Sequence, residues 1–279
     1  MRTTGWAVIN TLGRQIVTAL AIAIYGFLYL PIVVLIAYSF SEGRLMSFPI
    51  QGFTLDWYAV LWRDTDMWHS ITNSAVVAIM VVPLSLFLGV LAAFALDRFE
   101  FIGKVVFERI IMLPLIIPGV ITGLSILLVL KKADVPLSLF TVVLGHAVAW
   151  MPIVVTQVYA RLRRFDRSLE YASMDLGANR FQTFFRVTLP SIRSAIIGSA
   201  LLVFTLSFDE IAITFFLTGS KNTLPMHIWS MMREGVTPEI NAVATCVVVV
   251  SFGAVLLNAL LNGRGESTSP EMTTEQQRP

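Results

Sequence analysis

The sequence predicts an all-α integral membrane protein with six transmembrane helices and with both termini in the cytoplasm. Hydrophobic residues make up 56% of the 279-residue chain and charged residues only 14%, whereas charged residues make up about 25% of a typical soluble domain. The charges are also confined to short segments that separate long apolar intervals. Composition and charge distribution together therefore favour a chain that lies mostly in lipid.

Six intervals with few or no charges are each long enough to cross the hydrocarbon core, which takes about 20 apolar residues. In chain order they cover residues 15–41, 70–96, 110–130, 135–160, 194–220 and 240–263. The first interval stays apolar from Ala19 to Ala37 and no small-residue cleavage site follows it, so we expect a retained helix rather than a signal peptide. Residues 1–263 are expected to form one transmembrane domain. The polar residues 264–279 are expected to form a disordered cytoplasmic tail.

The orientation follows from the unequal distribution of lysine and arginine. The N-terminus, the loops after the second and fourth intervals, and the C-terminal tail hold fourteen of them, and the opposite side holds six. Loops rich in lysine and arginine stay in the cytoplasm. Both chain ends and residues 161–193 are therefore predicted to be cytoplasmic.

The composition also argues against several functional classes. A net charge of +2 is too small to suggest a nucleic acid partner, and Cys246 is the only cysteine, so no disulfide can form within the chain. The histidines His69, His146 and His227 fall in separate segments without the spacing of metal ligands. No arrangement of serine, histidine and acidic residues suggests a nucleophilic enzyme.

The cytoplasmic segment 165–190 is predicted to form a helix, a glycine turn and a second helix. Apolar residues form a stripe with gaps of three and four residues, which is typical of one helix face: Phe165, Leu169, Ala172 and Leu176. Gly177 is suited to end this helix. Asn179 and Gln182 have the spacing of a reciprocal cap for the next helix. Pro190 is expected to stop the second helix before the fifth membrane helix begins.

Periodicity alone leaves two interpretations of this segment open. It could lie in the lipid headgroup layer, as amphipathic helices do, or it could fill a groove on a soluble partner.

The residue pattern favours the partner, because Glu170-x-Ala172, Gly177 and Leu189-Pro190 resemble the cytoplasmic "EAA" loop of ATP-binding-cassette (ABC) importer permeases. The stretches "GFTLDWYAVL" (52–61), "SFDEIAITFFLTG" (207–219) and "GVTPEINAVAT" (235–245) look like the spermidine/putrescine-type permeases of that family. Tyr171 departs from the pattern, because it occupies the first alanine position of the motif.

The resemblance implies a type I importer permease fold in which the helix from Glu170 to Gly177 docks on a cytoplasmic ATPase. It also implies a second related permease, two copies of the ATPase, an extracytoplasmic substrate-binding protein and a place in the lipid of the bacterial inner membrane. The chain has no G-x-x-x-x-G-K-[ST] phosphate loop, so ATP and Mg are expected on the ATPase and no cofactor on this chain. The implied substrate is a polyamine such as spermidine or putrescine, with an amino-acid derivative or a phosphonate as the alternative.

Three residues in the predicted spans are candidates for the substrate pathway. Asp209 and Glu210 form an acidic pair about 24 Å along the helix from Arg193, at ~1.5 Å per residue, and acids within the membrane usually face a cavity or a pathway. At least one of them is predicted to attract a cationic substrate; the alternative is an acid satisfied by a neighbouring helix. Trp150 could hold an ammonium group by cation–π attraction, or it could simply pack between helices.

Two other classes of protein remain as alternatives. An ion-coupled secondary transporter would also carry acids within a helix, but it has no need of the Glu170–Pro190 arrangement. A membrane scaffold or sensor would use the cytoplasmic helices for binding alone.

Overall fold

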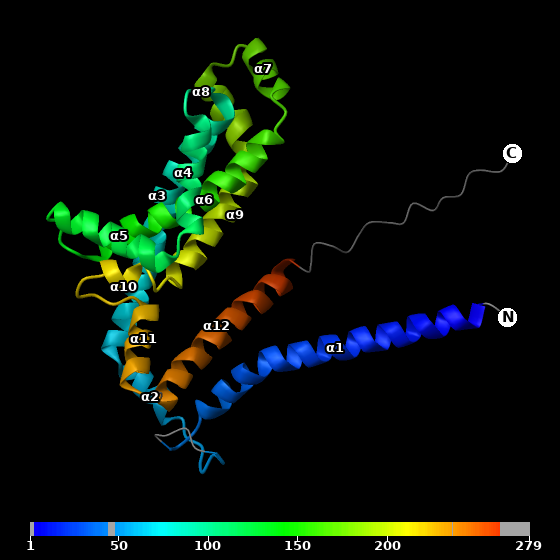
Figure 1. The fold of residues 1–279 in the computed structure, drawn as a ribbon, viewed down its shortest axis with the longest axis vertical. Helices are drawn as coiled ribbons and strands as arrows, with labels where there is room; N and C mark the ends of the chain where they lie inside the picture. Colours follow the sequence, from blue (N-terminus) through cyan, green and yellow to red (C-terminus); the bar gives the residue numbers. More distant parts are fainter. Residues whose placement is uncertain (1–2, 44–47, 236, 263–279) are drawn as a thin grey trace. The chain divides into compact units, whose positions relative to one another are not determined.

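The computed structural model describes residues 3–43, 48–235 and 237–262, and these are helical except for loops and one isolated β-bridge between Ser41 and Phe53. The all-α prediction is confirmed for them. They form two compact units (Figure 1). One unit comprises the described residues up to Arg63 and from Met232 onward, and the other runs from Asp64 to Met231.

The first unit contains three helices, α1 (Thr3–Tyr38), α2 (Asp56–Arg63) and α12 (Pro238–Asn262), and α12 packs against the other two. Two polar contacts anchor α2 to the chain that follows α1. The hydroxyls of Ser39 and Tyr58 are 2.7 Å apart, and the indole of Trp57 donates a hydrogen bond of 2.7 Å to the carbonyl of Ser41.

The second unit is built around α3 (Thr65–Arg98), α6 (Leu139–Arg163) and α9 (Leu189–Phe208), which pack side by side (Figure 1). Small and branched apolar side chains fill their interface, among them Val77, Val81, Ala93, Val154, Val158, Ile192 and Val203. The short helices α7 (Ser168–Asp175) and α8 (Arg180–Thr183) lie at one end of this bundle. The helix α10 (Thr214–Leu217) and the start of α11 (Leu224–Glu234) lie at the other end (Figure 1).

Four helices among the described residues are long and apolar enough to cross a membrane: Gly13–Tyr38, Thr65–Arg98, Leu139–Arg163 and Arg180–Phe208. A fifth crossing is available if the bent pair α4 (Lys104–Ile116) and α5 (Gly119–Lys132) serves as one span. In the sixth predicted interval, α12 contributes a shorter apolar helix over Pro238–Gly253. The tail 264–279 lies outside the described residues.

The third interval, 110–130, is not the single straight helix that the sequence predicted. The chain bends by 111° between α4 and α5, and Ile117 at the bend has extended backbone angles (φ −77°, ψ 132°). The cause is Pro118, because a proline sterically disfavours the helical conformation of the residue before it.

Pro190 does not stop a helix, and that prediction was wrong. The helical chain continues from Arg180 to Phe208, through a π-helical turn at Phe184–Thr188 that leads directly into α9. Proline in a regular helix lacks an N–H donor and clashes with the carbonyl four residues earlier. Here Pro190 lies in the first turn of α9, after a wider turn in which the Leu189 N–H bonds to the carbonyl of Phe184, five residues back.

Close packing of α3 on α6 gives a first testable prediction. A methyl group added at Gly89 would come within 2.5 Å of Val154 Cβ and 3.1 Å of the Met151 carbonyl oxygen, whereas one added at Gly26 would meet nothing within 4 Å. Overpacking a tight core costs about 1–3 kcal/mol. Gly89→Ala is expected to lower the thermal unfolding midpoint of the detergent-purified protein, and Gly26→Ala is not. Equal midpoints for the two variants would contradict this packing.

Candidate functional site

The segment 165–190 has the predicted helix–glycine–helix form. Gly177 follows α7 with a left-handed backbone (φ +90°), which glycine adopts without steric cost. Asn179 then caps α8, and its reciprocal hydrogen bonds with Gln182 both measure 2.9 Å. The two helices are tied together by the hydroxyls of Ser173 and Thr183, which are 3.1 Å apart.

Glu170, the acid of the motif, points into the protein rather than away from it. Its carboxylate accepts a hydrogen bond of 2.7 Å from the Arg98 guanidinium at the end of α3. It also accepts one from the hydroxyl of Thr188 in the π-helical turn. The side chains of Glu170 and Arg98 are only 15% and 21% exposed. Glu170 therefore fastens α7 to two other elements of the same chain.

A second ion pair completes this attachment. Asp97, whose side chain is 2% exposed, lies 3.0 Å from Arg167 and 3.3 Å from Arg98. Asp97, Arg98, Arg167 and Glu170 form a charge-balanced network, which we call the α3–α7 clamp. Sequence reasoning missed Asp97, Arg98 and Thr188, because nothing in one sequence indicates a pairing across 72 residues.

The segment also carries large apolar side chains that are exposed. Four of these side chains are 52% to 90% exposed: Leu169, Tyr171, Leu176 and Phe181. Ala172 and Gly177 are exposed on the same segment, and Pro190 is exposed at the start of α9, next to the half-buried Leu189. We call the four large side chains the apolar knob. Beside it, hydrogen bonds from Ser168 lower the pKa of the Asp166 carboxyl.

The acidic pair lies at a break between helices, not within a continuous one as the sequence predicted. The helix α9 ends at Phe208 and α10 begins at Thr214, so Asp209 to Ile213 form a connection that we call the acidic break. The Glu210 carboxylate accepts a hydrogen bond of 3.0 Å from the Ile213 N–H, and Thr214 donates one of 3.0 Å to the Glu210 carbonyl. The Glu210 carboxylate is therefore satisfied within the connection that precedes α10.

Asp209 differs from its neighbour, because its side chain is exposed. Within the part of the chain that the structure describes, its carboxylate has no hydrogen bond or ion pair. The pair is thus divided into an acid that is already satisfied by the Ile213 N–H and an acid that is free to bind another group.

His146, which is fully buried on α6, holds the acidic break from one side. Its Nδ1 is 2.9 Å from the hydroxyl of Ser207, before the break, and its Nε2 is 2.9 Å from the hydroxyl of Thr214, after it. Because Thr214 donates its own hydrogen to Glu210, it accepts one from the imidazole, which places the ring hydrogen on Nε2. Ser207 then donates to Nδ1. The sequence showed His146 only as an isolated histidine.

Glycines bring α6 and a further helix, α5, close to the same break. A methyl group added at Gly145 on α6 would lie 2.3 Å from a Leu217 methyl, and one added at Gly123 on α5 would lie 3.0 Å from Ile213 Cα. The Thr141 hydroxyl also donates 2.7 Å to the Leu217 carbonyl. The acidic break is therefore packed tightly between α5 and α6.

Trp150 lies one helical turn after His146 on α6 and is half-buried against the core of the second unit. Its indole N–H is buried and has no hydrogen-bond acceptor among the described residues. The contacts with this core agree with the packing alternative for Trp150, and its place on the substrate pathway stays a prediction.

Comparison with known proteins identifies close relatives over most of the chain. The family of binding-protein-dependent transport system inner membrane components matches residues 85–264. The chain is 33% identical over 251 residues to the spermidine/putrescine transport system permease protein PotC of Escherichia coli K12, covering 90% of this chain and 95% of the relative. It is 39% identical over 247 residues to the putrescine transport system permease protein PotI of the same strain, covering 84% and 88%.

Solved structures share the fold at lower identity. A bacterial ABC transporter involved in the import of the acidic polysaccharide alginate has a chain that superposes with a TM-score of 0.67 at 16% identity, over 94% of this chain and 98% of that one. An amino acid ABC transporter with histidines gives a TM-score of 0.56 at 17% identity, over 76% and 100%. The fold is therefore that of ABC transporter membrane subunits.

Proposed function

The chain belongs to the family of binding-protein-dependent transport system inner membrane components, and from this premise we propose that it is a permease subunit of an ATP-driven polyamine importer. The names of its relatives support putrescine or spermidine as the substrate. The proposal of a cationic substrate rests on a single observation, the position of Asp209. This acid is exposed, has no partner among the described residues and lies in a helical break of an apolar bundle.

The topology that we propose has six spans, with residues 1–263 as one type I transmembrane domain and 264–279 as a cytoplasmic tail. The bent pair α4 and α5 supplies the third span, and α12 supplies the sixth. The excess of lysine and arginine supports a cytoplasmic position for both termini and for α7. The end of the bundle that carries α10 and α11 then faces outward.

The proposed partners follow from the family and from the apolar knob. An ATPase homodimer on the cytoplasmic face binds ATP and Mg and receives the knob in a cleft. The α3–α7 clamp transmits the closure of that dimer to α3, whose length spans the bundle. A second homologous permease completes the pathway, and an extracytoplasmic binding protein delivers the substrate. Alternating access then exposes Asp209 to each side in turn.

The substrate assignment gives a second prediction. Asp209→Asn removes the charge that attracts an ammonium group, and a tenfold weaker interaction corresponds to about 1.4 kcal/mol. ATP-dependent putrescine uptake into proteoliposomes of the assembled transporter is expected to show a KM raised about tenfold. The control Glu108→Gln, which neutralises an exposed acid on α4, is expected to leave the KM unchanged.

The same assay separates this function from the alternatives. An unchanged KM for Asp209→Asn would contradict the role of that carboxylate. Uptake that persists without ATP would point to an ion-coupled secondary transporter. Uptake of an amino-acid derivative or a phosphonate but of no polyamine would keep the importer class and overturn the substrate.

A further inference from the structure

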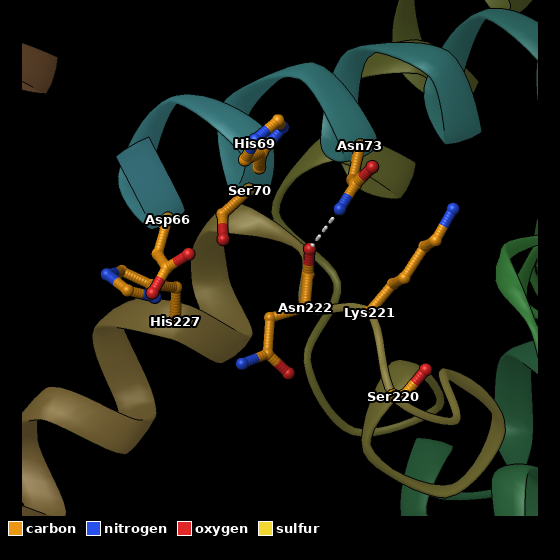
Figure 2. Close-up of a pocket in the computed structure, with 8 residues that line it drawn as sticks. All are labelled: Asp66, His69, Ser70, Asn73, Ser220, Lys221, Asn222 and His227. Atoms are coloured by element: carbon orange, nitrogen blue, oxygen red, sulfur yellow. Dashed lines mark hydrogen bonds between the residues drawn. The ribbon is translucent and has the colours of Figure 1, made fainter. Parts of the chain in front are cut away.

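A polar pocket lies at the α10–α11 end of the second unit, remote from the apolar knob at the other end. It has a volume of about 500 Å³, within the ~300–1,000 Å³ range of small-molecule sites. Figure 2 shows that its lining comes from the first turns of α3, from the loop before α11 and from α11 itself. We propose that this pocket binds a small zwitterion, with its ammonium group at Asp66 and its carboxylate at Lys221.

The pocket has fixed walls. The Asn73 side chain on α3 donates a hydrogen bond of 2.8 Å to the Asn222 carbonyl in the loop. The Leu224 N–H at the start of α11 donates one of 2.8 Å to the hydroxyl of Ser74. The loop is also closed on itself by a hydrogen bond from the Thr218 hydroxyl to the Lys221 carbonyl. The backbone that carries Lys221 is therefore held against α3.

Ser70 offers a hydroxyl group to a molecule in the pocket. The residue is only 3% exposed, and its hydroxyl points into the pocket (Figure 2). Among the described residues this hydroxyl has no hydrogen-bond partner. Because this hydroxyl lines the open pocket and is not among the buried atoms that lack a partner, it is accessible to donate a hydrogen bond to a bound polar molecule.

The two ends of the pocket carry opposite charges. Asp66 lies beside His227 at one end, and the Nε2 of that histidine is 3.6 Å from the Asp64 carboxylate. Lys221 lies at the other end, beyond Asn73 and Asn222 (Figure 2). An ammonium group is attracted to the acidic end and a carboxylate to the lysine. A diamine would place a positive charge against Lys221, so the pocket is not a second site for a polyamine.

The test compares two ligands with the same four-carbon chain, γ-aminobutyrate and putrescine. The protein, together with the subunits that co-purify with it, is placed in lipid nanodiscs, and equilibrium binding of radiolabelled γ-aminobutyrate is measured without ATP. Direct binding of radiolabelled β-alanine and ε-aminocaproate covers shorter and longer spacings of the two charges. We expect saturable binding of at least one of these three ω-amino acids. Binding of none would overturn the inference.

Three variants sharpen the test. Lys221→Met is expected to weaken ω-amino acid binding at least tenfold. Lys221→Glu is expected to change the preference of the pocket from an ω-amino acid to putrescine, because a pocket with two acidic ends suits a diamine. Putrescine should therefore bind more tightly to this variant than to the unmodified protein. Lys132→Glu makes the same charge reversal at an exposed lysine that ends α5, and it should change neither. The site would be refuted if Lys221→Glu and Lys132→Glu weakened ω-amino acid binding equally. It would also be refuted if Lys221→Glu did not bind putrescine in preference to the ω-amino acid.

This inference does not depend on the polyamine assignment. Polyamine uptake is measured with ATP and depends on Asp209, whereas ω-amino acid binding is measured without ATP and depends on Lys221. If one of the two experiments contradicts its proposal, the other proposal still stands.

Discussion

His146→Ala is expected to cause the largest loss of stability and to misplace Asp209. The substitution leaves the hydroxyl of Ser207, which is 4% exposed, without its partner. It also removes one of the two hydrogen bonds of the Thr214 hydroxyl, which is 0% exposed and still donates to the Glu210 carbonyl. A buried polar group left without a partner costs about 1–3 kcal/mol. Together with the lost hydrogen bond to Thr214, which contributes about 0.5–1.5 kcal/mol, we expect a loss of about 2 kcal/mol or more. This loss lowers the unfolding midpoint by about 4–8 °C in a chain of this size.

The experiment measures thermal unfolding in detergent together with putrescine uptake. His146→Gln, which keeps one donor and one acceptor in its side chain, should recover part of the loss. Val148→Ala is the matched control, because Val148 lies on the same helix and is 45% exposed.

A purely structural role for His146 would lower the amount of active protein and leave the KM for putrescine unchanged. A role in positioning the acidic break raises that KM in the protein that remains folded. If His146→Ala unfolds at the same temperature as Val148→Ala, the bridge does not stabilise the break.

Glu170→Gln is expected to reduce ATP-dependent uptake about tenfold or more, because it unbalances the α3–α7 clamp. The network holds two acids and two bases, with Asp97, Arg98 and Glu170 at most 21% exposed. Neutralising Glu170 leaves one positive charge uncompensated, and hydrogen bonds to charged groups contribute about 1.5–3 kcal/mol. In the proposed assembly α7 would then move without carrying α3 with it.

Uptake and ATP hydrolysis are measured on the same proteoliposomes. Hydrolysis that continues while uptake falls is the expected signature of uncoupling. Asp175→Asn is the matched control, since it makes the same change from carboxylate to amide at an exposed position of α7. Arg98→Gln should reproduce the loss, and the double variant should lose little more than either single variant, as residues in one network are not additive. Normal uptake by Glu170→Gln would show that the clamp does not couple the two movements.

The two predictions concern contacts that the sequence did not reveal. Only some of the elements that make these contacts, the helices α3, α6 and α7, were predicted. The helix–glycine–helix form of 165–190 followed from Gly177, Asn179 and Gln182, whose effects act within one turn of the chain. The direction of Glu170 did not follow, because its partners Arg98 and Thr188 are 72 and 18 residues away.

The bends in the bundle were only partly predictable from the sequence, because their causes are local but their effect on the helices depends on the fold. Pro118 was visible in the sequence, and its effect on Ile117 is local, but hydropathy averages over a window and predicted one straight span. Pro190 was assigned the opposite role, as a stop, because the π-helical turn that accommodates it cannot be read from composition. The acidic pair was placed within a helix, whereas packing against Gly123 and Gly145 accompanies a break at Asp209.

The sequence by itself determined the class of the molecule, its apolar helices and the helix–glycine–helix form of segment 165–190, because hydropathy, periodicity and capping depend on near neighbours in the chain. Only the tertiary structure decided which acid is satisfied and which is free, what Glu170 binds, and that His146 bridges the acidic break. Those outcomes depend on hydrogen bonds between side chains that are distant in sequence, and a single sequence does not specify which distant side chains come into contact.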